Sequence, residues 1–160
     1  MRFTTQNPEE TQALGQRIGK KLIPGDLVLL SGDLGTGKTT LAQGISQGLG
    51  VGPDQYVRSP SFTLINQYQG NIPVYHIDLY RIESGPDLAN LGLEEYLFGE
   101  GVALVEWSER LFLPLQDGTQ LFENFDYIEI SLEFAPNQGR LFEISLSNLS
   151  TRTHPLFSLH

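Results

Sequence analysis

Apolar residues recur at helical spacing near the start of the chain and predict a helix there. Leu14, Ile18 and Leu22 form one apolar stripe. Asn7 and the Pro-Glu-Glu that follows it have the features of a helix start, with an Asn cap, Pro in the first turn and carboxylates at the positive end of the helix dipole. A Pro-Gly pair at 24–25 ends the pattern. We therefore expect a helix from Asn7 to about Leu22.

Short continuous apolar runs alternate with helical segments through the middle of the chain. Strands that are buried on both faces of a parallel sheet have this pattern. The runs are Leu27–Leu30, Phe62–Ile65, Val74–Leu79 and Val102–Val105, and helices are expected from Thr39 to Leu49 and from about Pro86 to Leu97. Such alternation is typical of an α/β fold with a mainly parallel central sheet.

The C-terminal third differs, because apolar and polar residues alternate strictly. One alternating run spans Tyr127–Phe134 and a second spans Phe142–Leu146, with a Gly-containing turn between them. This pattern predicts a half-exposed antiparallel hairpin, which we expect at the edge of the sheet. Residues 148–160 are mostly polar and are expected to form a loose tail. The sequence thus predicts one domain over residues 1–147 and a polar C-terminal tail over 148–160.

Composition narrows the possible functions. The chain has 160 residues, 10 Lys and Arg against 19 Asp and Glu, a formal net charge of −9 and no cysteine. The lack of Cys excludes disulfides, thiolate metal sites and cysteine nucleophiles. The acidic balance argues against nucleic-acid binding through the protein's own basic surface, because neutralising phosphate needs Lys and Arg. With no apolar stretch near the roughly 20 residues of a membrane helix and no signal-peptide core, we expect a soluble, cytoplasmic protein.

A glycine-rich loop between a predicted strand and a predicted helix carries the clearest chemistry. Residues Gly32–Thr39 match G-x-x-x-x-G-K-[ST], the phosphate-binding pattern. The glycines allow backbone N–H groups to approach phosphate oxygens, and the helix that follows directs its positive end at the same anion. Lys38 is expected to reach the β- and γ-phosphates, and the hydroxyl of Thr39 to coordinate Mg²⁺.

Two carboxylates end predicted strands at the edge where an open α/β sheet binds its ligands. Asp78 ends one strand, and Glu106 directly follows Val102–Val105. One acid would orient Mg²⁺, and the other would position or polarise the attacking water. Asp33 lies inside the loop, where its carboxylate would repel phosphate unless it points outward. Asp26 precedes its strand and lies at the wrong end of the sheet.

Several other residues leave two interpretations open. Ser59–Thr63 could close over the γ-phosphate and the metal, or could be a turn that enters a strand. A structural role is favoured for His76 over a catalytic one, and a core position for Trp107 over stacking at the site. An arginine of this chain or of a partner could neutralise charge in the transition state. The candidates in this chain are Arg58, Arg81, Arg110 and Arg140.

Four sequence blocks together resemble the TsaE family, small bacterial P-loop ATPases of tRNA threonylcarbamoyladenosine synthesis. The blocks are Gly32–Thr40, Ser59–Leu64, His76–Arg81 and Glu106–Glu109, and H-x-D-L-Y-R followed by E-W-x-E is the specific part. The resemblance extends from about Glu9 to Leu146. It implies a P-loop NTPase-like three-layer sandwich with a mixed sheet. It also implies binding of ATP or ADP with Mg²⁺ and slow Mg²⁺-dependent ATP hydrolysis.

The resemblance further implies partners. TsaD and TsaB would transfer a threonylcarbamoyl group to adenosine 37 of tRNAs that read codons beginning with A, and hydrolysis would reset that complex. The chain would therefore meet tRNA only indirectly.

Residue roles follow from the resemblance by position. Lys38, Asp78 and Glu106 would be catalytic, and Thr39 with Glu106 would bind Mg²⁺. The nucleotide-binding set would be Gly32, Gly35, Thr36, Gly37, Lys38, Thr39 and Thr40. Glu10 or Thr11 would touch adenine. Ser61 stands where the family usually has Thr, so the hydroxyl is kept and the methyl group is not.

Three other functions fit part of the pattern. A small P-loop kinase usually needs an arginine-rich lid, whereas the arginines here are scattered. A GTPase switch selects guanine with N-K-x-D, and no such sequence follows the glycine loop. A nucleotide-sensing module differs from a slow ATPase only in degree. The kinase and the sensing module remain as alternatives.

Overall fold

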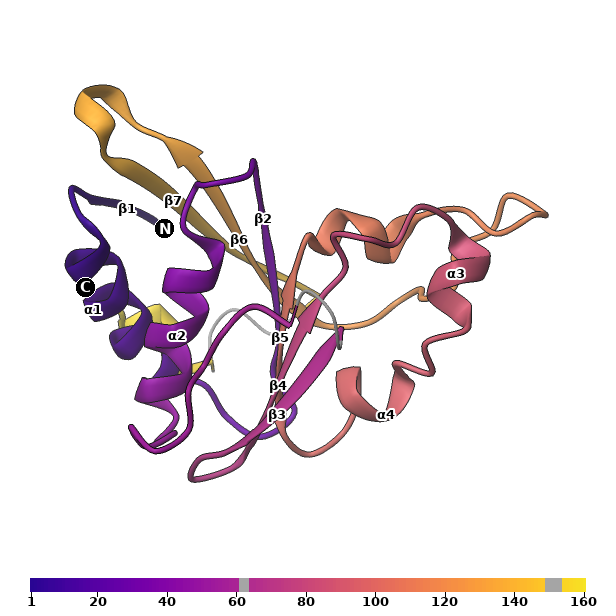
Figure 1. Ribbon diagram of the computed structural model, residues 1–160, viewed down its shortest axis with the longest axis horizontal. Helices are drawn as coiled ribbons and strands as arrows, with labels where there is room; N and C mark the ends of the chain where they lie inside the picture. Colours follow the sequence, from indigo (N-terminus) through magenta and orange to yellow (C-terminus); the bar gives the residue numbers. More distant parts are fainter. Residues whose placement is uncertain (61–63, 149–153) are drawn as a thin grey trace.

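A mixed sheet forms the centre of the computed structural model, which describes residues 1–60, 64–148 and 154–160 (Figure 1). Within these residues seven strands lie in the order β1-β7-β6-β2-β5-β4-β3. Their bounds are β1 Arg2–Thr5, β2 Leu27–Gly32, β3 Ile65–Gln69, β4 Pro73–Asp78, β5 Val102–Glu106, β6 Tyr127–Phe134 and β7 Arg140–Ser147. The four inner strands β6, β2, β5 and β4 are parallel. The outer pairs β1–β7, β6–β7 and β3–β4 are antiparallel.

Helices cover both faces of the sheet and give three layers (Figure 1). On one face lie α1 (Pro8–Gly19) and α2 (Lys38–Gly48); on the other lie α3 (Gly85–Ala89), α4 (Glu94–Leu97) and the 3₁₀ helix η1 (Ser108–Phe112). Because successive strand residues point to opposite faces, Val28 and Leu30 belong to the first apolar core, and Leu27 and Leu29 to the second. The parallel strands therefore read as continuous apolar runs.

Glycines allow α1 and α2 to touch backbone to backbone. A Cβ atom added at Gly15 would lie 2.6 Å from the carbonyl oxygen of Leu41, and one added at Gly44 would lie 2.3 Å from that of Gln12. Gly19 and Gly48, one helical turn further along, make the same kind of approach. The contact fixes the start of α1 beside the start of α2.

The elements around the glycine loop are confirmed. Asn7 caps α1, since its Oδ1 accepts a hydrogen bond of 2.8 Å from the amide of Glu10. The strands expected at Leu27–Leu30, Val74–Leu79 and Val102–Val105 are β2, β4 and β5. The run at Phe62–Ile65 falls largely on residues 61–63, outside the described residues, and β3 begins at Ile65.

Two expectations about the middle and the edge of the sheet are wrong. The hairpin β6–β7 forms as expected, but β1 pairs with β7 and takes the edge, while β6 joins the parallel strands. The helix expected from Pro86 to Leu97 is two short helices. Gly92 interrupts them with a φ of +62°, a left-handed conformation that breaks a helix.

The loose tail is also a wrong expectation for the residues that the structure describes. The 3₁₀ helix η3 (Pro155–Ser158) returns to α1, and Leu156 and Leu159 are buried in the core between α1, α2 and the sheet. His154 Nδ1 accepts from the amide of Leu156, so Nε2 carries the proton and donates to the Asp26 carboxylate at 3.1 Å. Burial raises the pKa of Asp26, and the hydrogen bond from Ile23 and the proximity of His154 oppose that rise.

Candidate functional site

The glycine loop turns the chain back from β2 into α2 and forms an open cradle. Gly32, Gly35 and Gly37 have φ values of +147°, +82° and +103°. At Gly32 an added Cβ would meet the carbonyl oxygen of Leu132 at 2.5 Å, whereas at Gly35 and Gly37 nothing lies nearer than 4.0 Å. Gly37 is the N-cap of α2 and supplies no side-chain cap. Uncapped amides at a helix start, beside open backbone, form a site for an anion.

Lys38 lies in the centre of this cradle. Its ammonium donates to the carbonyl oxygens of Gly32 at 2.6 Å and Asp33 at 2.8 Å, and the residue is 5% exposed. Burial lowers the pKa of Lys38, while nearby carboxylates, Glu106 foremost, oppose that shift. The side chain of Asp33 is exposed. The loop thus holds a cation directly over its own backbone, where a phosphate would supply the opposite charge.

The two strand-end carboxylates lie side by side, as expected. Asp78 and Glu106 are direct partners in the register of β4 and β5. Oε1 of Glu106 accepts a hydrogen bond of 2.8 Å from Thr39, and Oε2 lies 2.6 Å from Nε2 of His76. Both carboxylates are almost completely buried, at 5% for Asp78 and 2% for Glu106.

The carboxylate of Asp78 is held at both oxygens. Oδ2 accepts from the hydroxyl of Ser59, and Oδ1 accepts from the amide of Tyr80 at 2.9 Å. The described part of the predicted switch segment, Ser59 and Pro60, therefore reaches the site through Ser59. Ser61 and Thr63 lie outside the described residues.

These groups line a cleft of about 460 Å³. Trp107 forms part of its wall and is half-buried, so it packs against the second apolar core and also faces the site. The chain leaves β5 with a left-handed Trp107 (φ +56°), and the indole ring lies 4.2 Å from the ammonium of Lys38. The full lining is Leu34, Gly35, Gly37, Lys38, Thr39, Thr40, Ser59, Asp78, Tyr80, Glu106 and Trp107.

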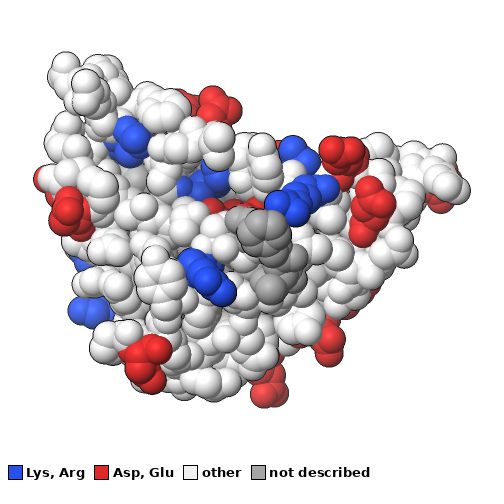
Figure 2. All heavy atoms as spheres, in the orientation of Figure 1, with Lys and Arg blue, Asp and Glu red and all other residues white. Residues whose placement is uncertain are grey.

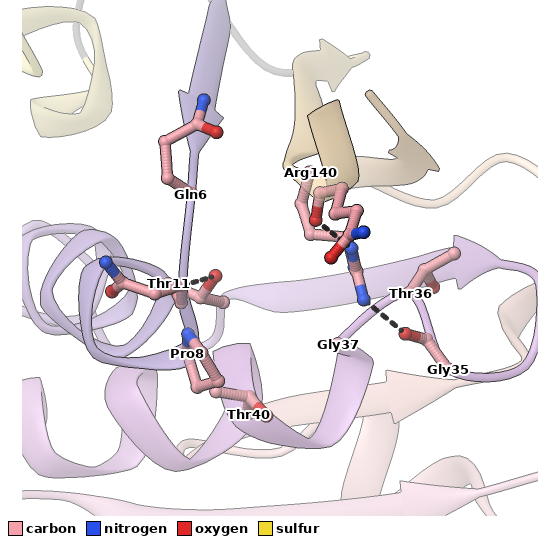
Figure 3. Close-up of a pocket in the computed structure, with 10 residues that line it drawn as sticks. Gln6, Pro8, Thr11, Gly35, Thr36, Gly37, Thr40 and Arg140 are labelled. Atoms are coloured by element: carbon pink, nitrogen blue, oxygen red, sulfur yellow. Dashed lines mark hydrogen bonds between the residues drawn. The ribbon is translucent and has the colours of Figure 1, made fainter. Parts of the chain in front are cut away.

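A second cavity, of about 220 Å³, opens on the other side of the loop between the start of α1 and the β6–β7 hairpin (Figure 3). It shares Gly35, Gly37 and Thr40 with the cleft, so the two cavities lie against the same stretch of the loop. Thr11, one of the two residues expected to touch adenine, lines this cavity. The other, Glu10, accepts from the amide of Gln6 at 2.8 Å and does not line the cavity.

The hairpin contributes lining residues that the sequence did not single out. Arg140 donates to the carbonyl oxygen of Gly35 at 3.2 Å, and Gln138 and Gln6 complete that wall (Figure 3). Arg140 was one of four equal arginine candidates, because only the tertiary fold brings the hairpin to the loop. Thr36 turns inward, and its hydroxyl donates to Asp33 within the loop at 2.8 Å.

Basic side chains gather around the middle of the face drawn in Figure 2, and acidic ones lie mostly toward its margins. Arg110 is one basic residue beside the cleft, since its guanidinium lies 5.8 Å from the ring of Trp107 and donates to the carbonyl of Ile82. In a chain of net charge −9 this arrangement favours an anionic ligand at the site.

The chemistry of the site fits a nucleotide with Mg²⁺. A hydroxyl and a carboxylate, Thr39 and Glu106, are the hard oxygen ligands that Mg²⁺ takes alongside phosphate and water. Among the described residues, no group of three or more His, Cys, Asp or Glu forms a metal cluster by itself. In the same residues, no helix has the length and apolarity needed to cross a bilayer.

The chain is similar to known proteins over most of its length. The family model described as threonylcarbamoyl adenosine biosynthesis protein TsaE matches residues 5–141. The tRNA threonylcarbamoyladenosine biosynthesis protein TsaE of Bacillus subtilis is 46% identical over 109 residues, which are 68% of this chain and 66% of that protein. The protein of the same name from Nostoc is 41% identical over 145 residues, 88% of this chain and 82% of that one. The crystal structure of Bacillus subtilis YdiB superimposes with a TM-score of 0.72 at 34% identity, covering 91% of this chain and 84% of that one.

Proposed function

The chain belongs to the TsaE family, and on this premise we propose that it binds ATP with Mg²⁺ and hydrolyses it slowly in tRNA threonylcarbamoyladenosine biosynthesis. The family names support the pathway. The observation that carries the chemistry is one cleft in which Lys38 fills the glycine loop and Thr39 lies 2.8 Å from Glu106.

The two cavities suggest how ATP would bind. The phosphates would lie in the cradle, where Lys38 exchanges its loop carbonyls for β- and γ-phosphate oxygens and the first amides of α2 donate to the same anion. The base and ribose would occupy the second cavity, between Thr11 and Arg140 (Figure 3). Thr40, which lines both cavities, would lie where the phosphates meet the ribose.

Thr39 and Glu106 would hold Mg²⁺, which supplies charge neutralisation to the phosphates when it is bound. Asp78 stands beside Glu106 on the neighbouring strand and would orient the attacking water and accept its proton. Its oxygen Oδ2 is bonded to a hydroxyl, which can itself rotate to donate elsewhere.

The proposed partners are TsaD and TsaB, and hydrolysis would reset their complex between rounds of tRNA modification. The acidic composition supports an indirect contact with tRNA through such partners, because the chain has few Lys and Arg side chains to bind phosphates.

Reconstitution with TsaB and TsaD tests the proposal. Phosphate release and tRNA modification should be followed over repeated cycles, with this chain, without it and with Lys38→Ala as the matched control. We expect modification to continue past the first cycle only with the unaltered chain. Transfer of phosphate to an acceptor would indicate a kinase instead, and ATP binding without phosphate release would indicate a nucleotide-sensing module.

A further inference from the structure

A buried histidine lies directly behind Glu106. Nε2 of His76 is 2.6 Å from Oε2 of Glu106, and the two side chains are 0% and 3% exposed. A carboxylate that accepts at this distance requires the proton on Nε2. The donor comes from β4, two residues before Asp78 and on the same face of the strand, whereas Thr39 approaches from α2. Each oxygen of Glu106 is thus held by a different element.

Packing alone does not require histidine at this position. In the register of the four parallel strands, His76 lies opposite Leu104, Leu104 opposite Val28, and Val28 opposite Ile128. These three residues are aliphatic and fully buried, whereas the direct partner of His76 on its other side, Asn66 of β3, is polar. Nδ1 of His76 has no hydrogen-bond partner within the part of the chain that the structure describes, so the ring is buried at a cost and only its Nε2 side is used.

We propose that His76 is a positioning residue, which holds Oε2 of Glu106 so that Oε1 stays directed at Thr39 and the cleft. The inference rests on the proposed function, since it concerns how Glu106 is prepared for Mg²⁺. Without the donor on Nε2, the carboxylate is fixed on one side only and must be ordered when the metal binds. Groups that orient a metal ligand in this way typically change metal affinity by about 10- to 100-fold when removed.

Two substitutions of similar polarity separate positioning from packing. In His76→Gln the amide nitrogen stands as many bonds from Cβ as Nε2 does, so it can reach Oε2. In His76→Asn the amide nitrogen is one bond short and cannot. His154→Leu is the matched control, because His154 and Asp26 form the other buried His–carboxylate pair among the described residues. Asp26 lies just before β2, at the opposite end of that strand from the glycine loop.

The measurement is the affinity for a non-hydrolysable ATP analogue by calorimetry, in excess Mg²⁺ and in excess EDTA. We expect every variant to match the unaltered chain in EDTA within about threefold. We expect Mg²⁺ to raise the affinity of the unaltered chain for the analogue. In His76→Asn this increase in affinity should be smaller by about tenfold or more, whereas His76→Gln and His154→Leu should keep most of it.

The positioning role is overturned if His76→Asn keeps the full gain from Mg²⁺, if it loses affinity equally in EDTA and Mg²⁺, or if the Gln variant is as impaired as the Asn variant. A different result separates the two proposals: no analogue binding by the unaltered chain would refute the proposed function itself.

Discussion

The hydroxyl of Ser59 donates a hydrogen bond of 2.5 Å to Oδ2 of Asp78 and attaches the segment after α2 to the second carboxylate of the site. If Asp78 accepts the proton of the attacking water, Asp78→Asn should lower the rate of hydrolysis by about 100-fold. Affinity for ATP should stay within about threefold, because the amide keeps the shape of the side chain. Single-turnover phosphate release with TsaB and TsaD present measures the rate.

Ser59→Ala is the graded control for Asp78. It keeps the carboxylate and removes one hydrogen bond to it, so we expect a loss of less than about tenfold. Normal phosphate release by Asp78→Asn would show that the water is activated by another group.

Lys38→Ala should lower ATP affinity by about 100-fold while leaving the fold intact. The described hydrogen bonds of the ammonium go to loop carbonyls, so its removal should change the stability of the fold little. Charged hydrogen bonds to phosphate would contribute about 1.5–3 kcal/mol each to the binding free energy. Calorimetry measures the affinity. Lys20→Ala, an exposed lysine at the end of α1, should bind as the unaltered chain does. Equal weakening of both variants would point to a general charge effect.

The backbone contact between α1 and α2 predicts that Gly44→Ala destabilises the fold. The added methyl group would lie 2.3 Å from the carbonyl oxygen of Gln12, so the helices must separate. Alanine is more favourable than glycine in a helix by roughly 1 kcal/mol. The strain should exceed this gain, so we expect the free energy of unfolding to fall by about 1–3 kcal/mol. Urea titration measures it.

Gly52→Ala is the control for this clash, because there the methyl group meets only the side chain of Asp54. It should leave stability within about 0.5 kcal/mol. A stable Gly44→Ala protein would mean that the two helices can move apart freely.

The buried carboxyl of Asp26 predicts a specific pH dependence. Its folded-state pKa is raised above 3.8, so the folded chain binds the proton more tightly than the unfolded chain does. Its contribution to stability is therefore fully present below pH 3.8 and is lost as pH rises through the folded pKa. Relative to Asp26→Asn, the unaltered chain should lose stability as pH rises from 3.8.

Urea titrations of both proteins from pH 3.5 to 7 measure that difference. The raised pKa of Asp26 would be refuted if the two proteins differ in the free energy of unfolding by the same amount at every pH in this range.

The centre of the fold was predictable because its signals are local. The apolar runs of β2, β4 and β5 and the Asn7 cap each act over a few residues. Two strands that end in carboxylates, beside a loop that ends in Lys38, meet at one edge of any parallel sheet. The positions of Asp78 and Glu106 could therefore be inferred before the structure, although their roles stay predictions.

The parts that were missed depend on distant partners. β1 has the sequence Arg-Phe-Thr-Thr, which has little strand pattern of its own and forms by pairing with β7. Leu156 and Leu159 sit in a mostly polar segment, and only the core that receives them shows their role. His76 shares a face with Asp78, but its contact with Glu106 needs the register between β4 and β5.

The central position of β2 has a consequence for synthesis on the ribosome. Val28 pairs on one side with Leu104 and on the other with Ile128, so neither neighbour exists when β2 leaves the exit tunnel. Because Gly32 lies against Leu132 of β6, we expect the glycine loop to reach its final shape only after most of the polypeptide has emerged. If the chain binds ATP as proposed, only nearly finished molecules would capture it, and a truncated translation product would not compete for ATP.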